Sequence, residues 1–242
     1  MAISTGALFN AIGILVGAMI GLAQTTPFSL RAQLWFRNAI GLFNVFYGLR
    51  LIYLSFDETF WSSFKQICVG LLAVVLGFWV GKLLRFQKMS NYVGRMAGDV
   101  INAATNKKPH SAADGFNACA ILFCAAPLGL VGAVTDGLSD YFYLLAVKAV
   151  MDALAMSGFV RIFRWPSALS AIPVFVFFSA ISLAVELYVK PYLTTPEANA
   201  VNMAAGLLAC IITIVIFEVR RVELANYLPA LVVAPLLTKW FG

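Results

Sequence analysis

The sequence predicts an all-α integral membrane protein, a polytopic bundle of seven or eight transmembrane helices that forms one domain over residues 1–242. Composition is the first reason: 62% of the residues are hydrophobic and 12% are charged, about half the charged share of a typical soluble domain. The second is that apolar runs of about 20 residues, the length that crosses a hydrocarbon core of roughly 30 Å, recur along the whole chain. The third is that Lys and Arg gather in alternate loops.

Eight apolar spans follow one another along the chain, and each is a candidate transmembrane helix. The fifth and the eighth are short and would be tilted or partly re-entrant, so seven full spans is the competing count. The predicted spans lie near residues 6–24, 34–54, 66–86, 114–134, 142–160, 168–189, 200–218 and 224–241.

Basic residues predict the orientation of the chain. If the N-terminus lies outside, the loops after the first, third, fifth and seventh spans are cytoplasmic. These loops and the adjoining helix ends hold 12 of the 17 Lys and Arg, whereas Asp57, Glu58, Asp136, Asp140 and Glu197 lie in the opposite loops. This placement explains the net charge of +6 without a nucleic-acid partner. No basic residue precedes the first span, so we expect that span to be retained and not cleaved as a signal peptide.

The longest loop, 87–112, contains a helical pattern. Its apolar residues recur at helical spacing with Arg95, Asp99 and Asn102 between them, which predicts an amphipathic helix at about 87–104 on the cytoplasmic membrane surface. The alternative is an ordinary solvated loop. The apolar residues of the pattern are Met89, Tyr92, Val93, Met96, Val100 and Ile101.

Short internal similarities suggest two four-helix halves, residues 1–134 and 142–242. VGLLAVV (69–75) resembles AGLLACI (205–211), at an offset of 136 residues, which would make the halves parallel repeats. FNAIGIL (9–15) resembles FNACAIL (116–122) and disagrees, because it links the first span to the fourth. Transporters are often built from repeats with the binding site at their interface.

Five stretches resemble a known family. They are GALFNAIGILVGAMIGL (6–22), AILFCAAPLGLVGAVTDGLSD (120–140), KAVMD (148–152), LTTPEANAVNMAAGLL (193–208) and NYLPALVVAPL (226–236). Over nearly its whole length the chain resembles the YqgA-like family of bacterial inner-membrane proteins, domain of unknown function 554. The resemblance implies a multi-pass protein of the bacterial inner (plasma) membrane, and transport is the function usually suggested for the family. The chain departs from the family in two places: Ala205 stands beside Gly206 where the family has a glycine pair, and DGLSD (136–140) is shorter than the family's DGLTGD.

Glycine and proline mark where helices pack closely or break. Glycines four residues apart form flat grooves that let helix backbones approach, either inside one bundle or at the seam of a homodimer. Pro127 interrupts the fourth span, and such breaks either point to a transport site or are ordinary packed kinks. The glycines that form these grooves are Gly13, Gly17 and Gly21 in the first span and Gly77 and Gly81 in the third.

The fifth span carries two opposite charges, Lys148 and Asp152, too deep to reach the membrane surface comfortably. Residues four apart share a helix face, but the order Lys then Asp is the less favourable one for pairing within a helix. We therefore expect further partners on other spans, with Asn10, Asn117, Tyr47 and the carbonyls freed near Pro127 as candidates. An intramembrane pair of this kind is either a substrate or ion site or a structural bridge.

The sequence excludes several classes of function. It contains no nucleophile–base arrangement, P-loop or GxGxxG turn, and we expect no enzyme activity and no cofactor. We also expect no metal site built from His and Cys, whereas ion sites built from carboxylate and carbonyl oxygens stay open. The single histidine, His110, lies in a polar loop, and the four cysteines read as small buried hydrophobic residues. The expected function is a membrane transporter or channel for a small solute or ion; the alternative is a non-transporting membrane scaffold or accessory subunit. The expected partners are the lipid bilayer, that solute or ion, and a second copy of the chain, with no nucleic acid.

Overall fold

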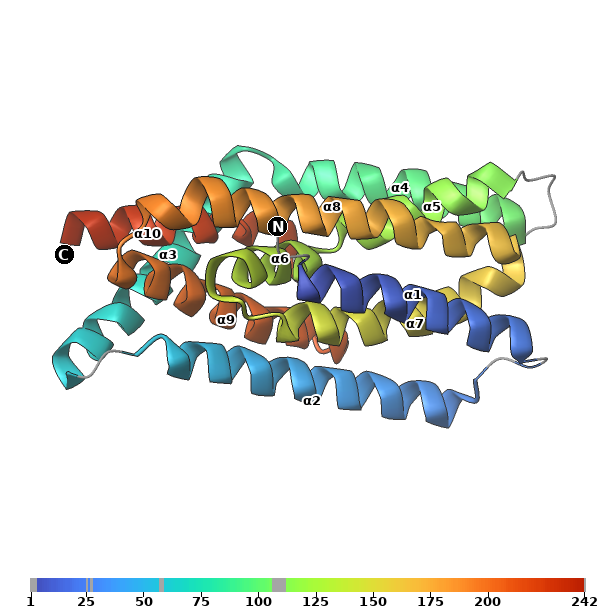
Figure 1. Cartoon of the computed structure of the whole chain (residues 1–242), viewed down its shortest axis with the longest axis horizontal. Helices are drawn as coiled ribbons and strands as arrows, with labels where there is room; N and C mark the ends of the chain where they lie inside the picture. The colour runs from blue at the N-terminus through green and yellow to red at the C-terminus, as the bar shows by residue number, and fades with distance from the viewer. Residues whose placement is uncertain (1–3, 25, 27, 57–58, 106–111, 242) are drawn as a thin grey trace.

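The computed structural model describes residues 4–241, except 25, 27, 57–58 and 106–111. The charges predicted for loops at Asp57, Glu58, Lys107 and Lys108, the histidine His110 and the first three residues lie outside the described part. The described residues form α-helices and short 3₁₀ or π segments, with no β-strand (Figure 1). The α-helices are α1 (Thr5–Ala23), α2 (Leu30–Leu54), α3 (Phe60–Leu83), α4 (Phe86–Thr105), α5 (Ala112–Ala125), α6 (Pro127–Ser139), α7 (Tyr143–Phe163), α8 (Ala171–Ala184), α9 (Thr195–Ile216) and α10 (Ala230–Phe241).

Five helical segments of the described residues are long and apolar enough to cross a membrane: α1, α3, α7, α9 and the continuous stretch Trp165–Tyr192 that contains α8. The bent pair of α5 and α6 makes a sixth if it is one span. The protein is thus all-α, with several helices suited to a membrane. The predicted count of seven or eight would also need α2, whose 25 residues include three arginines, and α10, which has only 12 residues.

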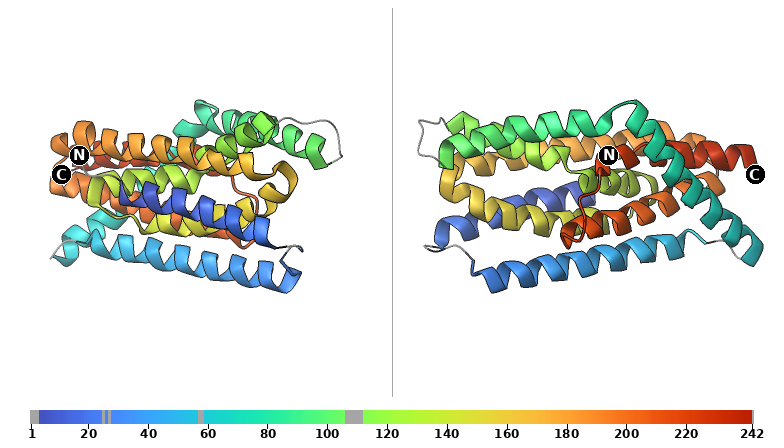
Figure 2. Two further views of the ribbon diagram at one scale, coloured as in Figure 1. Left: turned by 45° about the vertical axis from the view of Figure 1, so that its right-hand side comes forward. Right: turned by 180° about the vertical axis from the view of Figure 1, so that it is seen from behind.

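The bundle is held together by pairs of helices that are distant in the sequence. α1 packs along α7, α2 along α9, and α3 against both α9 and α10 (Figures 1 and 2). α2 lies at one side of the molecule, and Asn44 in its middle donates hydrogen bonds to the Ala209 carbonyl at 2.7 Å and the Thr213 hydroxyl at 2.9 Å. These bonds fix α2 against α9 inside the bundle, where an amide without partners would be costly.

The glycines of α1 face α7 inside the same chain. Gly13, Gly17 and Gly21 each lie against the backbone of the residue 136 positions later, which is Ala149, Ala153 and Ser157 in turn. A Cβ atom added to Gly13 would lie 2.5 Å from the Ala149 carbonyl oxygen. Two parallel helices therefore touch backbone to backbone. In the same way, Gly77 and Gly81 of α3 lie against Ala230 and Asn226.

A helix occupies Phe86–Thr105, where the sequence predicts an amphipathic one. Its small apolar residues Ala97 and Ala104 are buried, while Tyr92 and Met96 are exposed. The helix runs side by side with α5 along the long axis of the molecule, not across its end (Figures 1 and 2). The side chain of Gln87 fixes its start, since the Gln87 amide oxygen accepts from the Ala225 N–H at 3.1 Å.

Candidate functional site

Lys148 and Asp152 form an ion pair inside the bundle. Both lie on the inward face of α7, one helical turn apart, and the Lys148 ammonium donates a hydrogen bond to the Asp152 carboxylate. Lys148 is 1% exposed and Asp152 5% exposed, so neither charge reaches solvent. An isolated charge in the middle of a membrane helix costs roughly 2.5–3.5 kcal/mol on insertion scales, and pairing removes much of that cost.

Aromatic rings enclose the ammonium group. The Lys148 nitrogen lies 5.2 Å from the ring centre of Phe178 on α8 and 5.7 Å from that of Phe123 on α5. Ring faces carry negative potential, so both rings attract the cation while they exclude water. Gly129 of α6 closes another side, since a Cβ atom added there would lie 2.6 Å from the Lys148 side chain. The charged pair therefore lies where α5, α6, α7 and α8 meet.

A break in the helix adjoins this site. α5 ends at Ala125 and α6 begins at Pro127, with a bend of 60° between them. The bend follows from the proline, which has no N–H to donate and disfavours a helical conformation at the residue before it. Ala126 is accordingly extended, and its carbonyl accepts from the Gly129 N–H at 3.0 Å. The first turn of α6 thus begins beside Lys148.

Asn10 of α1 joins the pair from a different helix. Its side chain is fully buried and lies close enough to Asp152 to interact with the carboxylate. Neither the amide nitrogen nor the amide oxygen forms a hydrogen bond of normal geometry within the described part of the chain. A buried polar group left in this state costs roughly 1–3 kcal/mol. Asn10 is therefore a polar group without a full set of partners beside a buried carboxylate.

The other residues predicted for this site are placed differently. Pro127 forms the break beside the pair, but Asn117 is exposed on α5, about 9 Å along the helix before Phe123. Tyr47 stacks on Tyr143, with ring centres 4.8 Å apart, outside the surroundings described for the pair. Phe123 and Phe178 are not among the residues predicted for this site. With 20 phenylalanines in the chain, no signal in the sequence distinguishes these two.

A second pocket, of about 290 Å³, opens near the first residues of α1. We call it the acidic pocket, because Asp136, Asp140 and Glu186 line it, together with Ser4, Ser182 and Leu183. Asp136 is 6% exposed and accepts hydrogen bonds from the hydroxyls of Ser4 at 2.5 Å and Ser182 at 3.4 Å. Ser182 lies one turn beyond Phe178 on the same helical stretch, about 6 Å along its axis, so the pocket comes close to the charged pair.

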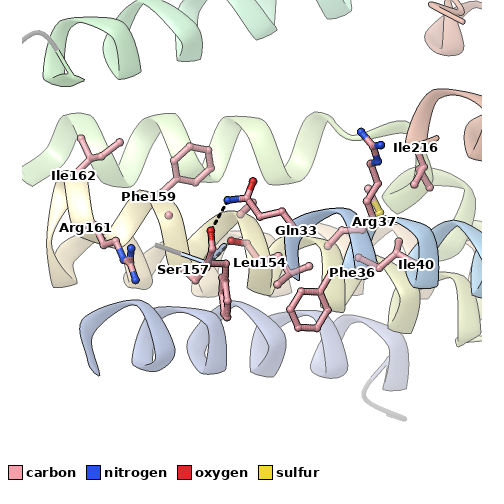
Figure 3. A pocket seen from close by; sticks show the side chains of 14 residues that line it. Gln33, Phe36, Arg37, Ile40, Leu154, Ser157, Phe159, Arg161, Ile162 and Ile216 are labelled. Atoms are coloured by element: carbon pink, nitrogen blue, oxygen red, sulfur yellow. Dashed lines mark hydrogen bonds between the residues drawn. The ribbon is translucent and has the colours of Figure 1, made fainter. Parts of the chain in front are cut away.

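A larger pocket of about 580 Å³ lies between α2 and α7 (Figure 3). We call it the α2–α7 pocket; it is lined mainly by apolar side chains, with Arg37 and Arg161 among them. Ala155, one turn after Asp152, also lines it. Neither this pocket nor the acidic pocket is lined by Lys148 or Asp152. The pair is therefore separated from both by packed side chains.

Comparison with known proteins identifies the family of this chain but does not identify an activity. The family model described as "Protein of unknown function (DUF554)" matches residues 5–239. The chain is 25% identical over 240 residues to the uncharacterized protein YqgA of Escherichia coli (strain K12), covering 97% of each chain. It is 23% identical over 235 residues to the uncharacterized membrane protein YdfK of Bacillus subtilis (strain 168), covering 96% of this chain and 94% of the relative. No solved structure matches the chain. Since the family model spans all but the ends of the sequence, the chain belongs to the DUF554 family.

Proposed function

We propose that the protein is a membrane transporter or channel for a small solute or ion, with its central site at Lys148 and Asp152, and that it is not an enzyme. One observation carries this proposal: a fully enclosed ion pair lies beside the incompletely bonded Asn10 and a broken helix. Ionisable groups within membrane segments commonly mark ion or proton pathways. Broken helices commonly adjoin such sites, because their free backbone groups bind ligands.

A small cation is the ligand that this chemistry favours. A proton or metal cation would compete with the Lys148 ammonium for the Asp152 carboxylate, and the Asn10 amide oxygen would supply a second oxygen ligand. The displaced ammonium would remain between the rings of Phe123 and Phe178, which attract a cation without a counter-ion. Lys148 would then act as an internal cation that leaves and reoccupies the site in each cycle.

We interpret the structure as an occluded state, in which the ion pair is closed off from solvent. The transported cation would reach the ion pair from the acidic pocket. Asp136 of that pocket lies on α6, as Gly129 does, and Ser182 lies on α8, as Phe178 does. The bend at Ala126 supplies a hinge at which α6 can move relative to α5. A tilt of α6 would withdraw Gly129 from Lys148 and open the pair toward that pocket.

We also propose how the chain crosses the membrane. We place the chain in the bacterial inner membrane with the N-terminus outside, and count α2 and α10 among seven or eight spans. The constant offset of 136 residues between α1 and the α7 positions it touches equals the offset of the internal similarity, which favours two parallel halves.

We also propose a homodimer. Its seam would lie outside the grooves of α1 and α3, because both are filled within the chain.

Flux measurements on proteoliposomes test the function. Purified protein would be reconstituted with a pH-sensitive dye inside, or with radioactive sodium or rubidium outside. We expect wild-type protein to carry at least one of these cations, and Asp152→Asn to reduce its flux about tenfold or more, as loss of a charged ligand implies. Asp99→Asn is the matched control, since it makes the same chemical change at an exposed position on α4. Equal flux in the Asp152 variant and the control, or no cation flux by folded wild-type protein, would refute the proposal.

The complete enclosure of the pair favours a second candidate, a non-transporting membrane scaffold or accessory subunit. In that case Lys148 and Asp152 serve only to hold helices together. The double variant Lys148→Met/Asp152→Leu separates the two functions, because it removes both charges and leaves neither unpaired. A scaffold keeps its cellular role in this variant, whereas a transporter keeps its fold and loses its flux.

A further inference from the structure

The α2–α7 pocket combines two kinds of surface. Its walls are apolar, formed by Phe36 and Ile40 of α2, Leu154 and Ile162 of α7, and Ile216 at the end of α9 (Figure 3). It lies where α2 begins and where α7 and α9 end. By the predicted orientation, these are the cytoplasmic ends of the three helices. A site of this kind faces both the acyl chains and the headgroups of the inner leaflet.

Two arginines give the pocket its charge. Arg37 and Arg161 lie toward opposite ends of it (Figure 3), and among the described residues no Asp or Glu lines it. Arg37 forms an ion pair with Glu218, whose side chain is 73% exposed. Arg161 donates to the Gln24 side chain at 3.1 Å and to the Thr26 carbonyl at 2.5 Å. Both charged side chains of the described lining are therefore basic, and one of them is already paired with an exposed carboxylate.

Each guanidinium retains a donor that these contacts do not use. The Nε atoms of Arg37 and Arg161 are buried and have no hydrogen-bond partner within the described part of the chain. A guanidinium has five N–H donors in a fixed planar arrangement, and it binds phosphate oxygens with charge-assisted hydrogen bonds. Both arginine side chains are only partly buried and line the pocket, so their remaining N–H groups can meet an anion that enters it.

We propose that the α2–α7 pocket binds an anionic phospholipid. The phosphate would accept hydrogen bonds from Arg161 or Arg37, while an acyl chain would lie against Phe36, Ile40, Leu154 and Ile162. Basic pockets between membrane helices on the cytoplasmic side are typical sites for acidic headgroups. A soluble anion would gain nothing from the apolar walls, and a zwitterionic lipid would bring no net charge to the arginines. This proposal does not depend on transport.

Native mass spectrometry of the full-length protein in detergent tests the site. Phosphatidylglycerol and phosphatidylethanolamine would be added in equal amounts, and the lipid retained on the protein would be counted. We expect wild-type protein to retain phosphatidylglycerol in preference, and Arg37→Gln/Arg161→Gln to bind it at least about tenfold more weakly, because charge-assisted hydrogen bonds are lost. The matched control is Arg31→Gln/Arg221→Gln, which removes the same charge from exposed positions outside the pocket lining.

A steric variant keeps the test valid if loss of the arginines harms folding. Gly158 lines the pocket, and a Cβ atom added there meets nothing within 4 Å. Gly158→Phe therefore fills the cavity while it leaves both arginines in place, and we expect it also to lose phosphatidylglycerol. Equal retention of the two lipids by wild-type protein overturns the proposal, as does equal weakening in the pocket variant and the control. Displacement of the lipid by millimolar inorganic phosphate overturns it too, because the site would then recognise a free anion.

Discussion

Gly17 of α1 lies directly against the backbone of Ala153 in α7, so close that a single added methyl group would overlap the Ala153 carbonyl. The contact is one of three in a row, with Gly13 before it and Gly21 after it. Small residues at this spacing let two helices gain dispersion contacts and weak backbone interactions over a long seam. The seam also determines how closely Asn10 of α1 approaches Asp152 of α7.

We expect Gly17→Ala to destabilise the protein by about 1–3 kcal/mol, because the added carbon must push α1 away from α7. Gly94→Ala on α4 is the control, since its Cβ atom meets nothing within 4 Å. Alanine favours a helix over glycine by about 0.5–1 kcal/mol, so the control should be neutral or slightly stabilising. Thermal unfolding in detergent, followed by tryptophan fluorescence, measures both. Equal unfolding midpoints for the two variants would contradict the close packing.

The buried ion pair predicts a non-additive pattern of stability. Lys148→Met or Asp152→Leu alone should destabilise the protein by about 3–5 kcal/mol, because each leaves one buried charge without its partner. The double variant should recover most of this loss, since apolar side chains of similar size replace both charges. The same unfolding assay gives the coupling between the sites. If the single effects simply add in the double variant, the two side chains do not form the pair described above.

Two fully buried asparagines should respond in opposite ways to the same substitution. Asn10→Leu removes an amide without normal hydrogen bonds, so we expect it to raise stability by about 1–3 kcal/mol. Asn44→Leu removes hydrogen bonds to Ala209 and Thr213, so we expect it to lower stability. If the site is a transport site, Asn10→Leu should also lose flux as it gains stability. A loss of stability in Asn10→Leu equal to that in Asn44→Leu would show that Asn10 has partners after all.

Cysteine labelling tests access and orientation together. In a background without the four native cysteines, lipid-depleted Ala155→Cys should react with a membrane-impermeant maleimide from the cytoplasmic side, because Ala155 lines the α2–α7 pocket. Added phosphatidylglycerol should slow this reaction, because the proposed lipid would cover Ala155. Leu183→Cys should react from the outer side, because Leu183 lines the acidic pocket. Met156→Cys is the control and should not react from either side, because Met156 is fully buried. Reaction of the first two from the same side would contradict the proposed orientation.

The sequence could predict the features that depend on local chemistry. The helical class follows from composition, the helix at Phe86–Thr105 from its spacing, and the interruption near Pro127 from the missing N–H of proline. The proximity of Lys148 and Asp152 follows from the geometry of one helical turn. In each case the cause lies within a few residues of the effect.

Features that depend on which helices meet were harder to predict. Asn10 and Asn117 look alike in sequence, since each stands in an FNA tripeptide, yet only Asn10 faces Asp152. Phe123 and Phe178 enclose Lys148 because their side chains reach it from α5 and α8, and no local pattern in the sequence encodes that arrangement. The span count also remained open, because α2 carries arginines whose surroundings depend on its neighbours.

The seam between α1 and α7 also has a consequence for how the protein is made. α1 is synthesised before α7, and its partner surface on α7 is complete only about 140 residues later, which at 5–20 residues per second is a delay of roughly 7–28 s. During that time the glycine face of α1 and the amide of Asn10 must be kept in lipid or in the insertion machinery without their final neighbours. Insertion of α1 and its assembly against α7 are therefore separate events, the second of which waits for more than a hundred further residues.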